Sequence, residues 1–465
     1  METRTEVDLL GERQVPADAY YGIHTLRAWE NFQISGIAIS AWPTLINALA
    51  AVKEAAAQAN TELGLLPQDL CTAIVAACQD VRAGELHDQF IIDTIQGGAG
   101  TSTNMNANEV ICNRALEHLG RQRGEYRYLH PNEHVNLAQS TNDVYPTTIR
   151  IATCYAIDYL LDAMEVLRTA FERKAIEFAD ILKLGRTQLQ DAVPMTLGQE
   201  FSTYAVMIEE DMARLREASL LIREINLGAT AIGTGITAHP AYAGRALAAL
   251  CRITGLELTT APNLIEATQD CGAFVQISGV LKRIAVKLSK TCNDLRLLSS
   301  GPRAGLGEIN LPPMQAGSSI MPGKVNPVIP EVVNQIAFEV FGNDTTITFA
   351  AEAGQLQLNA FEPVIASSLF RSFSHLTRGC LTLARKCVDG ITANPERLRE
   401  TIEKSIALAT ALNPIIGYKN ATSVAAEAHA TGKTVREVVL ARGLLSAEAL
   451  DEALRPEALI RPKLQ

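Results

Sequence analysis

The chain has 465 residues, of which 41 are Lys or Arg and 51 are Asp or Glu, so its formal net charge is −10. Hydrophobic residues make up 47% and charged residues 20%, a composition that predicts a folded protein with an ordinary core and excludes a disordered chain. The acidic balance argues against a nucleic-acid binder, because neutralising phosphates requires clustered Lys and Arg.

The first residues and the cysteines of the chain predict the cellular compartment of the protein. The first eight residues, METRTEVD, lack the basic and apolar regions of a secretory signal. No apolar run approaches the roughly 20 residues that a membrane span requires. The nine cysteines are scattered and form no C-x-x-C pair, which is typical of reduced thiols. We therefore expect a cytoplasmic protein with no nucleic-acid or membrane partner.

The N-terminal part has a mixed pattern. Helical stretches such as 48–63 and 70–82 alternate there with polar, glycine-rich turns. We assign residues 1–140 to an N-terminal domain that is mixed but mainly helical. Any β-strands of the protein are expected to be confined to this part.

Beyond Pro146, apolar residues recur at three- and four-residue spacing over unusually long stretches. The predicted helices span residues 149–182, 196–224, 273–298, 328–353 and 363–388. Each is at least twice as long as the average helix of about 11 residues. Long amphipathic helices with short connections pack best against one another, so the sequence predicts a helical bundle domain over 141–395. Small residues on several faces favour an oligomer that forms through this bundle.

The helical pattern breaks near residues 391–395, and the apolar stretches beyond are shorter. We assign residues 396–465 to a small helical C-terminal domain. The predicted fold class is therefore mainly α, with three domains.

Residues 317–327, with the sequence GSSIMPGKVNP, interrupt the helical pattern. Two glycines and two prolines within this segment preclude a helix and favour a mobile loop. The loop carries two hydroxyls, a lysine and an asparagine between long helices, which suits a lid that closes over a ligand. It is not a P-loop, because Val325 stands where that motif requires Ser or Thr. A polar connector is the plainer interpretation of this segment taken alone.

Three further polar segments carry short hydrogen-bond donors. Residues 97–104 (GGAGTSTN) look like a backbone nest before a helix, where exposed N–H groups bind carboxylates, although a simple N-cap from residues 101–104 is the plainer interpretation. Residues 139–143 (QSTND) and 185–191 (GRTQLQD) also supply hydroxyls and amides. His130 and His134 have the i,i+4 spacing of metal ligands, but the proline between them disqualifies a zinc motif.

Together the four segments offer hydroxyl, amide and backbone donors, one lysine and no catalytic histidine. Such a set of donors binds a small polyanion and stabilises negative charge that develops on oxygen. No G-x-G-x-x-G follows a predicted strand, which makes nicotinamide chemistry improbable.

In their order and spacing, these four segments resemble the aspartase/fumarase superfamily. GSSIMPGKVNP is highly specific to the superfamily but is shared by several of its activities. The finer similarity is to its aspartate ammonia-lyases, over the segments 8–23 (DLLGERQVPADAYYGI), 97–106, 185–200, 229–235, 297–312 and 341–363. The resemblance implies the superfamily's three-domain fold, with a central long-helix bundle that forms the core of a homotetramer. It also implies that each active site is assembled from three chains.

The resemblance implies a carbon–nitrogen lyase that converts L-aspartate reversibly to fumarate and ammonia. The implied route is abstraction of a Cβ proton and an aci-carboxylate (enediolate) intermediate, with Ser318 as the general base. It assigns the β-carboxylate to Thr101, Ser140, Thr141 and Ser319, the α-carboxylate to Thr187, Lys324 and Asn326, and the amino group to Asn142 and Gln188. It implies no metal in the site and no required cofactor, while activation by a divalent cation such as Mg²⁺ is left open.

A fumarase, a sibling lyase and a non-catalytic scaffold stay open as different functions for the same fold. Class II fumarases share the loop but typically carry His where this chain has Gln188, paired with a Glu that corresponds to Glu331. A glutamine amide does not titrate in the working range, which disfavours fumarate hydration and leaves the proton on the amino side unassigned. The sibling lyase would accept another amine or a substituted aspartate, and the helical scaffold would convert neither L-aspartate nor L-malate.

Overall fold

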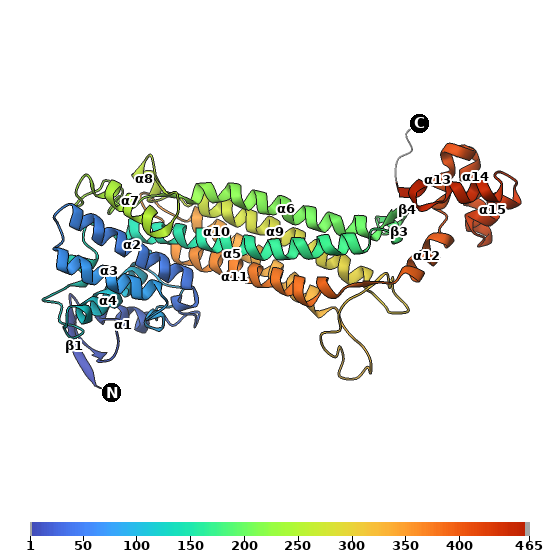
Figure 1. The fold of residues 1–465 in the computed structure, drawn as a ribbon. Coiled ribbons are helices and arrows are strands. Elements are labelled where there is room, and N and C mark those ends of the chain that lie inside the picture. Colours follow the sequence, from blue (N-terminus) through green and yellow to red (C-terminus); the bar gives the residue numbers. More distant parts are fainter. Residues whose placement is uncertain (1, 461–465) are drawn as a thin grey trace. The chain divides into compact units, whose positions relative to one another are not determined.

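The computed structural model describes residues 2–460, and this part of the chain is mainly α-helical (Figure 1). The chain divides into two compact units, each built from three segments. Unit 1 comprises residues 1–161, 213–285 and 338–376, and unit 2 comprises residues 162–212, 286–337 and 377–465. The three-domain division at residues 140 and 395 stays a prediction, and residues 461–465 of its last domain lie outside the described chain.

Unit 1 begins with an antiparallel pair of strands, β1 (Thr3–Asp8) and β2 (Gly11–Pro16). It continues with the helices α1 (Ile23–Asn31), α2 (Pro43–Glu62), α3 (Gln68–Arg82), α4 (Thr101–His118), α7 (Tyr242–Thr254) and α8 (Leu264–Ala267). Helix α2 is buried along most of its length, which fits its run of Ala and Leu. Its first residue is a proline, which is tolerated there because the first N–H groups of a helix have no intrahelical acceptor. Helices α3 and α7 pack against it.

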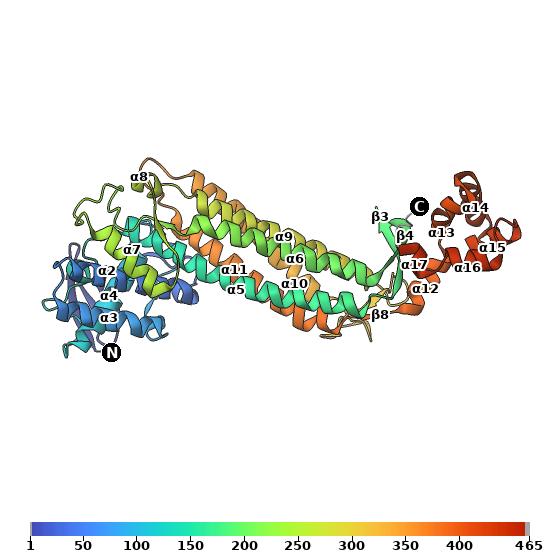
Figure 2. The ribbon, with the colours of Figure 1, turned by 45° about the horizontal axis from the view of Figure 1, so that its top comes forward.

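Five long helices confirm the predicted bundle pattern. They are α5 (Thr141–Glu177), α6 (Leu197–Ile222), α9 (Gly272–Leu298), α10 (Val328–Glu352) and α11 (Glu362–Lys386). Segments of all five occur in each unit, where they run side by side (Figures 1 and 2). Pro146 lies inside α5 rather than before it. The Asn142 carbonyl, to which a proline cannot donate, instead accepts the side-chain N–H of Asn226 at 3.1 Å.

Buried polar bonds join the long helices within each unit. In unit 1, Ser278 Oγ on α9 donates to Asp344 Oδ1 on α10 at 2.7 Å. In unit 2, Asn334 Nδ2 on α10 donates to Ser289 Oγ on α9 at 2.8 Å. These short side chains satisfy one another between apolar surfaces, which fixes the register of the helices.

Unit 2 ends in a cluster of short helices, as the sequence predicts. They are α12 (Pro395–Lys404), α13 (Leu408–Ile416), α14 (Tyr418–Thr431), α15 (Val435–Ala441), α16 (Ala447–Ala453) and α17 (Pro456–Ile460). Leu412, Val424 and Val438 are fully buried at their centre. A capping box between Thr434 and Glu437 starts α15.

The expectation that strands are confined to the N-terminal part is wrong. Strands β3 (Leu182–Thr187) and β4 (Gln190–Thr196) form an antiparallel hairpin in unit 2. The remaining pairs are β5 (Glu224–Ile225) with β6 (Thr259–Thr260), and β7 (Ile309–Asn310) with β8 (Thr392–Ala393). The predicted helix 149–182 therefore ends early, at Glu177. Apolar residues at 181, 182 and 184 fit a helical and an extended pattern equally well, so periodicity alone misplaces this boundary.

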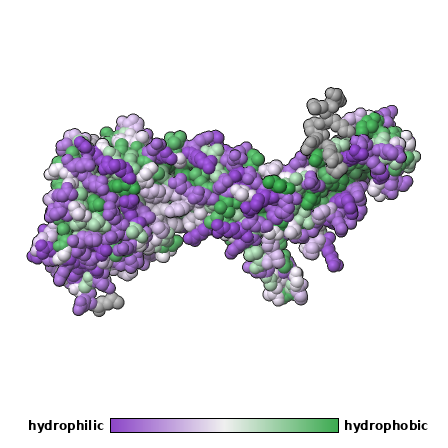
Figure 3. Space-filling model, viewed as in Figure 1, coloured by the Kyte–Doolittle hydropathy of each residue, from purple (hydrophilic) through white to green (hydrophobic). Residues whose placement is uncertain are grey.

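Large hydrophobic side chains are exposed on the long helices of the single chain. They include Val206, Leu220, Val286, Phe338 and Phe349, each more than half exposed. Green patches mark hydrophobic residues between the polar side chains of the visible face (Figure 3). Within residues 2–460, every helix lacks the length or the apolar character needed to cross a lipid bilayer.

Candidate active site

Thr101 lies at the start of α4, behind a sharp backbone turn. Gly98, Ala99 and Gly100 all have positive φ values, of 91°, 54° and 90°. A Cβ at Gly100 would come within 2.3 Å of the ring of Tyr145, so only glycine fits there. Gly100 is the N-cap and provides no side-chain cap. The simple side-chain N-cap by residues 101–104 is therefore not formed, because the glycine-rich turn takes the N-cap position one residue earlier.

Ser140, Thr141 and Asn142 form the start of α5 and are half-buried. Asp143 Oδ1 accepts the backbone N–H of Ser140 at 2.9 Å, while Ser140 Oγ accepts that of Asn142 at 3.3 Å. Both bonds satisfy backbone N–H groups at the start of the helix, as N-capping side chains do. The amide of Asn142 donates to Ala231 O at 2.7 Å, which leaves its Oδ1 available as an acceptor.

Asp143 itself is fully buried and joins α5 to the segment 226–231 of unit 1. Its Oδ2 accepts the N–H groups of Gly228 at 2.9 Å and Thr230 at 3.3 Å. Burial raises the pKa of Asp143 to about 6, although these N–H donors and the nearby Lys53 act in the opposite direction. Asp143 therefore holds the Ser140–Asn142 turn against the segment 226–231 through buried hydrogen bonds.

The remaining predicted segments lie in unit 2. Thr187 and Gln188 are exposed at the tip of the β3–β4 hairpin, where Gln188 and Leu189 have φ values of 53° and 62°. Two consecutive residues with positive φ are typical of a tight type I′ turn, which suits the twist of a hairpin. This geometry presents the Gln188 side chain beyond the end of both strands.

A group of buried charges supports the hairpin from below. Lys183 is almost fully buried, and its Nζ lies 2.7 Å from Glu308 Oε2 and 2.5 Å from Glu200 Oε2. Arg186 also pairs with Glu308. Breaking such a buried set would leave a charge without a partner, so these ion pairs hold β3 in place.

Ser318 lies in the loop between β7 and α10, which projects from unit 2 (Figure 1). The Ser318 hydroxyl is half-buried and accepts the backbone N–H groups of Ile320 at 3.2 Å and Met321 at 2.9 Å. The base of the loop is closed by two bonds. Gly317 N–H donates to Lys324 O at 2.7 Å, and Asn326 Nδ2 donates to Gly317 O at 2.7 Å. The predicted loop is confirmed, and Ser319 and Lys324 are exposed on it.

Comparison with known proteins decides the family. The model of the family described as "Lyase" matches residues 11–342, and that of the "Fumarase C C-terminus" matches residues 408–461. The chain is 59% identical to the aspartate ammonia-lyase of Pseudomonas aeruginosa, over 99% of this chain and 98% of that one. This chain belongs to the lyase family.

Further similarities of this lyase cover nearly the whole chain. The aspartate ammonia-lyase of Escherichia coli K12 is 57% identical over 99% of this chain and 96% of its own. The cobalt-bound structure of a "fumarate lyase:delta crystallin" from Brucella melitensis superposes with a TM-score of 0.97 at 58% identity, covering 99% of this chain and 100% of that one. A class II fumarase from Schistosoma mansoni gives a TM-score of 0.92 at 35% identity, covering 98% of each chain. The mainly α superfamily fold is thereby confirmed.

Some of the predicted site residues of this lyase lie in unit 1 and the others in unit 2. Thr101, Ser140, Thr141 and Asn142 belong to unit 1, where Asn104 Nδ2 of α4 donates to Thr141 Oγ1 of α5 at 3.2 Å and so joins the two helix starts. Unit 2 contains the rest, namely Thr187, Gln188, Ser318, Ser319, Lys324 and Asn326. Gly317, the neighbour of Ser318 in the sequence, is bonded to both Lys324 and Asn326 within the loop. The assignment of these residues to substrate groups stays a prediction.

Lys53, a fully buried lysine of α2 that donates to Asn104 Oδ1 at 2.6 Å, is not among the residues predicted from the sequence. Burial lowers its pKa to about 7. A signal was present, since Lys53 follows a continuous run of Ala, Leu and Val in which a lysine is unexpected.

His130 and His134 have local structural roles. His130 is the N-cap of a π-helical turn (Pro131–Val135) that contains His134, and His134 Nδ1 accepts the backbone N–H of His130 at 2.8 Å. His130 Nδ1 accepts that of Asn132 at 3.1 Å. Within residues 2–460, no group of three or more His, Cys, Asp or Glu side chains is placed to hold a metal ion.

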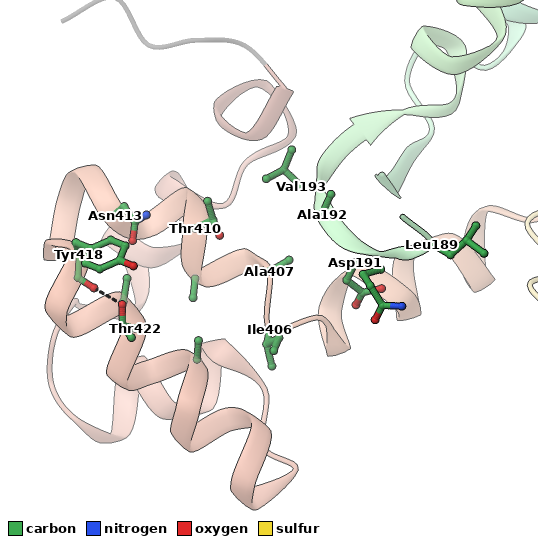
Figure 4. Close-up of a pocket in the computed structure, with 14 residues that line it drawn as sticks. Leu189, Asp191, Ala192, Val193, Ile406, Ala407, Thr410, Asn413, Tyr418 and Thr422 are labelled. Carbon is green, nitrogen blue, oxygen red and sulfur yellow. Dashed lines mark hydrogen bonds between the residues drawn. The ribbon is translucent and has the colours of Figure 1, made fainter. Parts of the chain in front are cut away.

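A pocket of about 780 Å³ lies in unit 2 between the start of β4 and the helices α13 and α14 (Figure 4). Asp191, Ala192 and Val193 face it from the hairpin, and Asn413 and Tyr418 line its opposite wall. None of the predicted site residues lines this pocket, although it adjoins the hairpin that carries Gln188.

Proposed function

We propose that this chain is an aspartate ammonia-lyase, a carbon–nitrogen lyase that converts L-aspartate to fumarate and ammonia. The observation that carries the mechanism is the hydrogen bonding of Ser318. Two loop N–H groups already point at its Oγ, the atom on which negative charge develops when the serine loses its proton. Such preorganised donors stabilise an alkoxide, so more of this serine is deprotonated and able to act as a base than of a free hydroxyl.

In the proposed reaction, the Ser318 alkoxide removes a proton from Cβ of L-aspartate. The electron pair of that C–H bond moves into the β-carboxylate, which becomes a doubly negative enediolate. Hydroxyls of Thr101, Ser140, Thr141 and Ser319 hold this group, with bonds that strengthen as its charge grows. Collapse of the enediolate then forms the C=C bond and expels the ammonium group from Cα as neutral ammonia. The proton on Ser318 passes to solvent.

The remaining residues bind the other end of the substrate in this proposal. Lys324 supplies the formal positive charge for the α-carboxylate, and Thr187 and Asn326 supply neutral donors. Asn142 and Gln188 accept hydrogen bonds from the amino group. The free Oδ1 of Asn142 supports that assignment, because an ammonium group donates hydrogen bonds only. No cofactor takes part in these steps.

We also propose a homotetramer formed through the long helices, in the cytoplasm. The exposed hydrophobic side chains of α6, α9 and α10 support an interface there. Light scattering is expected to give about four times the mass of one chain, and a monomeric mass at working concentration would contradict the proposal. Adding Mg²⁺ to metal-depleted enzyme tests the activation by a divalent cation that the sequence resemblance leaves open.

The test of the function is the ultraviolet absorbance of fumarate when the purified protein is mixed with L-aspartate, beside a sample with L-malate. Fumarate from aspartate alone is the expected result. Fumarate from malate alone would make the protein a fumarase and would assign a proton-relay role to another residue than Gln188. No product from either would direct the assay to substituted aspartates, and a further negative result would favour the scaffold.

A further inference from the structure

Lys53 is surrounded by the oxygen atoms of amide side chains. Its Nζ donates to Asn104 Oδ1 at 2.6 Å, to Gln139 Oε1 at 2.8 Å and to Asn136 Oδ1 at 3.0 Å. Three donated hydrogen bonds require all three protons of the ammonium form, which has only donors, so each of these amides turns its oxygen toward Lys53 and its NH₂ group away. The lysine therefore sets the direction of all three amides.

The orientation of the Asn104 amide in turn determines the hydrogen bonding of Thr141, a residue of the predicted carboxylate site. With its oxygen on Lys53, its Nδ2 donates to Thr141 Oγ1 at 3.2 Å. Asn136 Oδ1 accepts from Asn104 Nδ2 as well, at 3.2 Å, and from Asn108 Nδ2 at 3.1 Å, which makes rotation of the Asn104 amide costly. Thr141 Oγ1 is thus an acceptor on its buried side.

The proton of the Thr141 hydroxyl has to be donated elsewhere. Thr141 is the first residue of α5, so it has no helical carbonyl one turn earlier to which its hydroxyl could donate. In the described chain, no side chain or carbonyl accepts this proton, and the residue is only half-buried. The Thr141 hydroxyl can therefore donate its proton to a ligand that binds at the start of α5.

We propose that Lys53 and Asn104 are positioning residues that hold Thr141 as a hydrogen-bond donor to the β-carboxylate of the substrate. This inference rests on the proposed function, because it assigns Thr141 to that carboxylate. A carboxylate has only acceptors, so a threonine whose proton was drawn inward would present lone pairs to it and repel it. Because the Thr141 hydroxyl is oriented before the substrate binds, it does not have to rotate as the enediolate charge develops.

The substitution Asn104→Asp tests the proposal with little change of shape. The new carboxylate keeps an oxygen on Lys53, but it replaces the N–H donor by a second acceptor, so Thr141 must donate inward. We expect kcat/KM for L-aspartate to fall about 10- to 100-fold, the usual effect of losing a hydrogen bond to a charged group. Both a rise in KM and a fall in kcat are expected, because the bond to the β-carboxylate is present in the bound substrate and strengthens as the enediolate charge grows. An unchanged kcat/KM in the folded variant would overturn the proposal.

A double substitution separates positioning through Thr141 from a general structural effect. In a Thr141→Val background no hydroxyl is left to orient, so Asn104→Asp is expected to lower kcat/KM by less than about threefold further. Effects that multiply in full would show that Asn104 does not act through Thr141. Asn106→Asp is the matched control, since Asn106 lies on the same helix, is fully buried and donates to Gln89 O. It is expected to lower stability without the same rise in KM.

Two further measurements distinguish a failure of the positioning role from a failure of the proposed function. Lys53→Met removes the ammonium group that turns the amides and should also raise KM; if this variant does not fold, Asn104→Asp alone decides. Fumarate binding, measured by calorimetry, is compared in wild type and Asn104→Asp. A wild type that binds fumarate but does not convert L-aspartate would contradict the proposed function alone. A wild type that converts L-aspartate beside an Asn104→Asp variant of equal affinity and rate would contradict the positioning role alone.

Discussion

The two sets of predicted site residues are held in different ways. In unit 1, Thr101 and Thr141 lie at the first positions of long helices, above a buried network that contains Lys53 and Asp143. In unit 2, Gln188 lies at a hairpin tip, and Ser318 lies in a loop whose hydrogen bonds are mostly within itself. Unit 1 offers fixed donors, whereas unit 2 offers exposed groups on short connections.

This difference matches the different tasks that the proposed reaction gives to the two units. Charge develops on the β-carboxylate, and donors that stabilise developing charge work best when they cannot reorganise. The base and the α-carboxylate ligands have to admit the substrate and then exclude water, which suits a loop held by few contacts. We therefore expect that the reaction requires both the rigid helix starts of unit 1 and the locally organised loop of unit 2.

The largest effect is expected from Ser318→Ala, which removes the base from the loop and leaves the loop's closing bonds intact. Turnover should fall by about 10²- to 10⁴-fold or more, the usual contribution of a positioned base. Steady-state assays measure this, while light scattering checks that the variant keeps the mass of the wild type. A rate near that of the wild type would show that another group removes the proton.

The interior of unit 1 should respond to pH through Glu362, which is buried at the start of α11. Burial raises its pKa to about 8, against the opposing charge of Arg150. Since the unfolded carboxyl titrates near 4.5, the folded protein holds an extra proton between these values, and stability falls as pH rises from about 4.5 through 8. Glu362→Gln should remove this loss, which is on the order of 5 kcal/mol.

Melting temperatures of wild type and Glu362→Gln at pH 5 and pH 9 measure the effect. The wild type should lose stability relative to the variant at the higher pH. Glu352→Gln, at an exposed position near the end of α10, is the control and should leave the pH dependence unchanged. A difference between Glu362→Gln and wild type that does not vary with pH would mean that Glu362 is ionised throughout.

The rigidity of the helix start in unit 1 is tested at Gly100. Gly100→Ala would place a Cβ against the ring of Tyr145 at a φ of 90°, so we expect a loss of about 2–3 kcal/mol in stability. Gly98→Ala is the matched control, because its φ is 91° but the nearest atom is 3.9 Å away. Chemical denaturation should show a smaller loss for Gly98→Ala, of about 1 kcal/mol. Equal losses would show that the contact with Tyr145 can relax.

The sequence was sufficient for features that depend on neighbours along the chain. The 3.6-residue pattern located α9 and α10 to within a residue or two, and the glycines and prolines of residues 317–327 identified the loop. It failed at the β3–β4 hairpin, because the apolar residues there fit both periods and the turn has no Asn-Gly or Asp-Gly signal.

The supporting network of unit 1 could not be found in this way. Lys53 meets Asn104, Asn136 and Gln139 across 51, 83 and 86 residues of sequence, and Gly100 is required by the ring of Tyr145. Local patterns indicate which residues offer donors, but only the packed chain shows which donors are fixed and in which direction. The residues proposed to touch the substrate were therefore easier to predict than those that position them.

The smallest of these effects is expected at Lys324, an exposed residue of the loop in unit 2. Its substitution tests how this loop binds the negative charge of the substrate. Lys324→Ala should raise KM for L-aspartate about 10- to 50-fold with a smaller change in kcat, because the lysine binds the α-carboxylate, which keeps its charge throughout the reaction. Lys433→Ala, an equally exposed lysine of unit 2, controls for the loss of a positive charge. If KM is unchanged in Lys324→Ala, the α-carboxylate is bound without that charge, and the loop serves chiefly to carry Ser318.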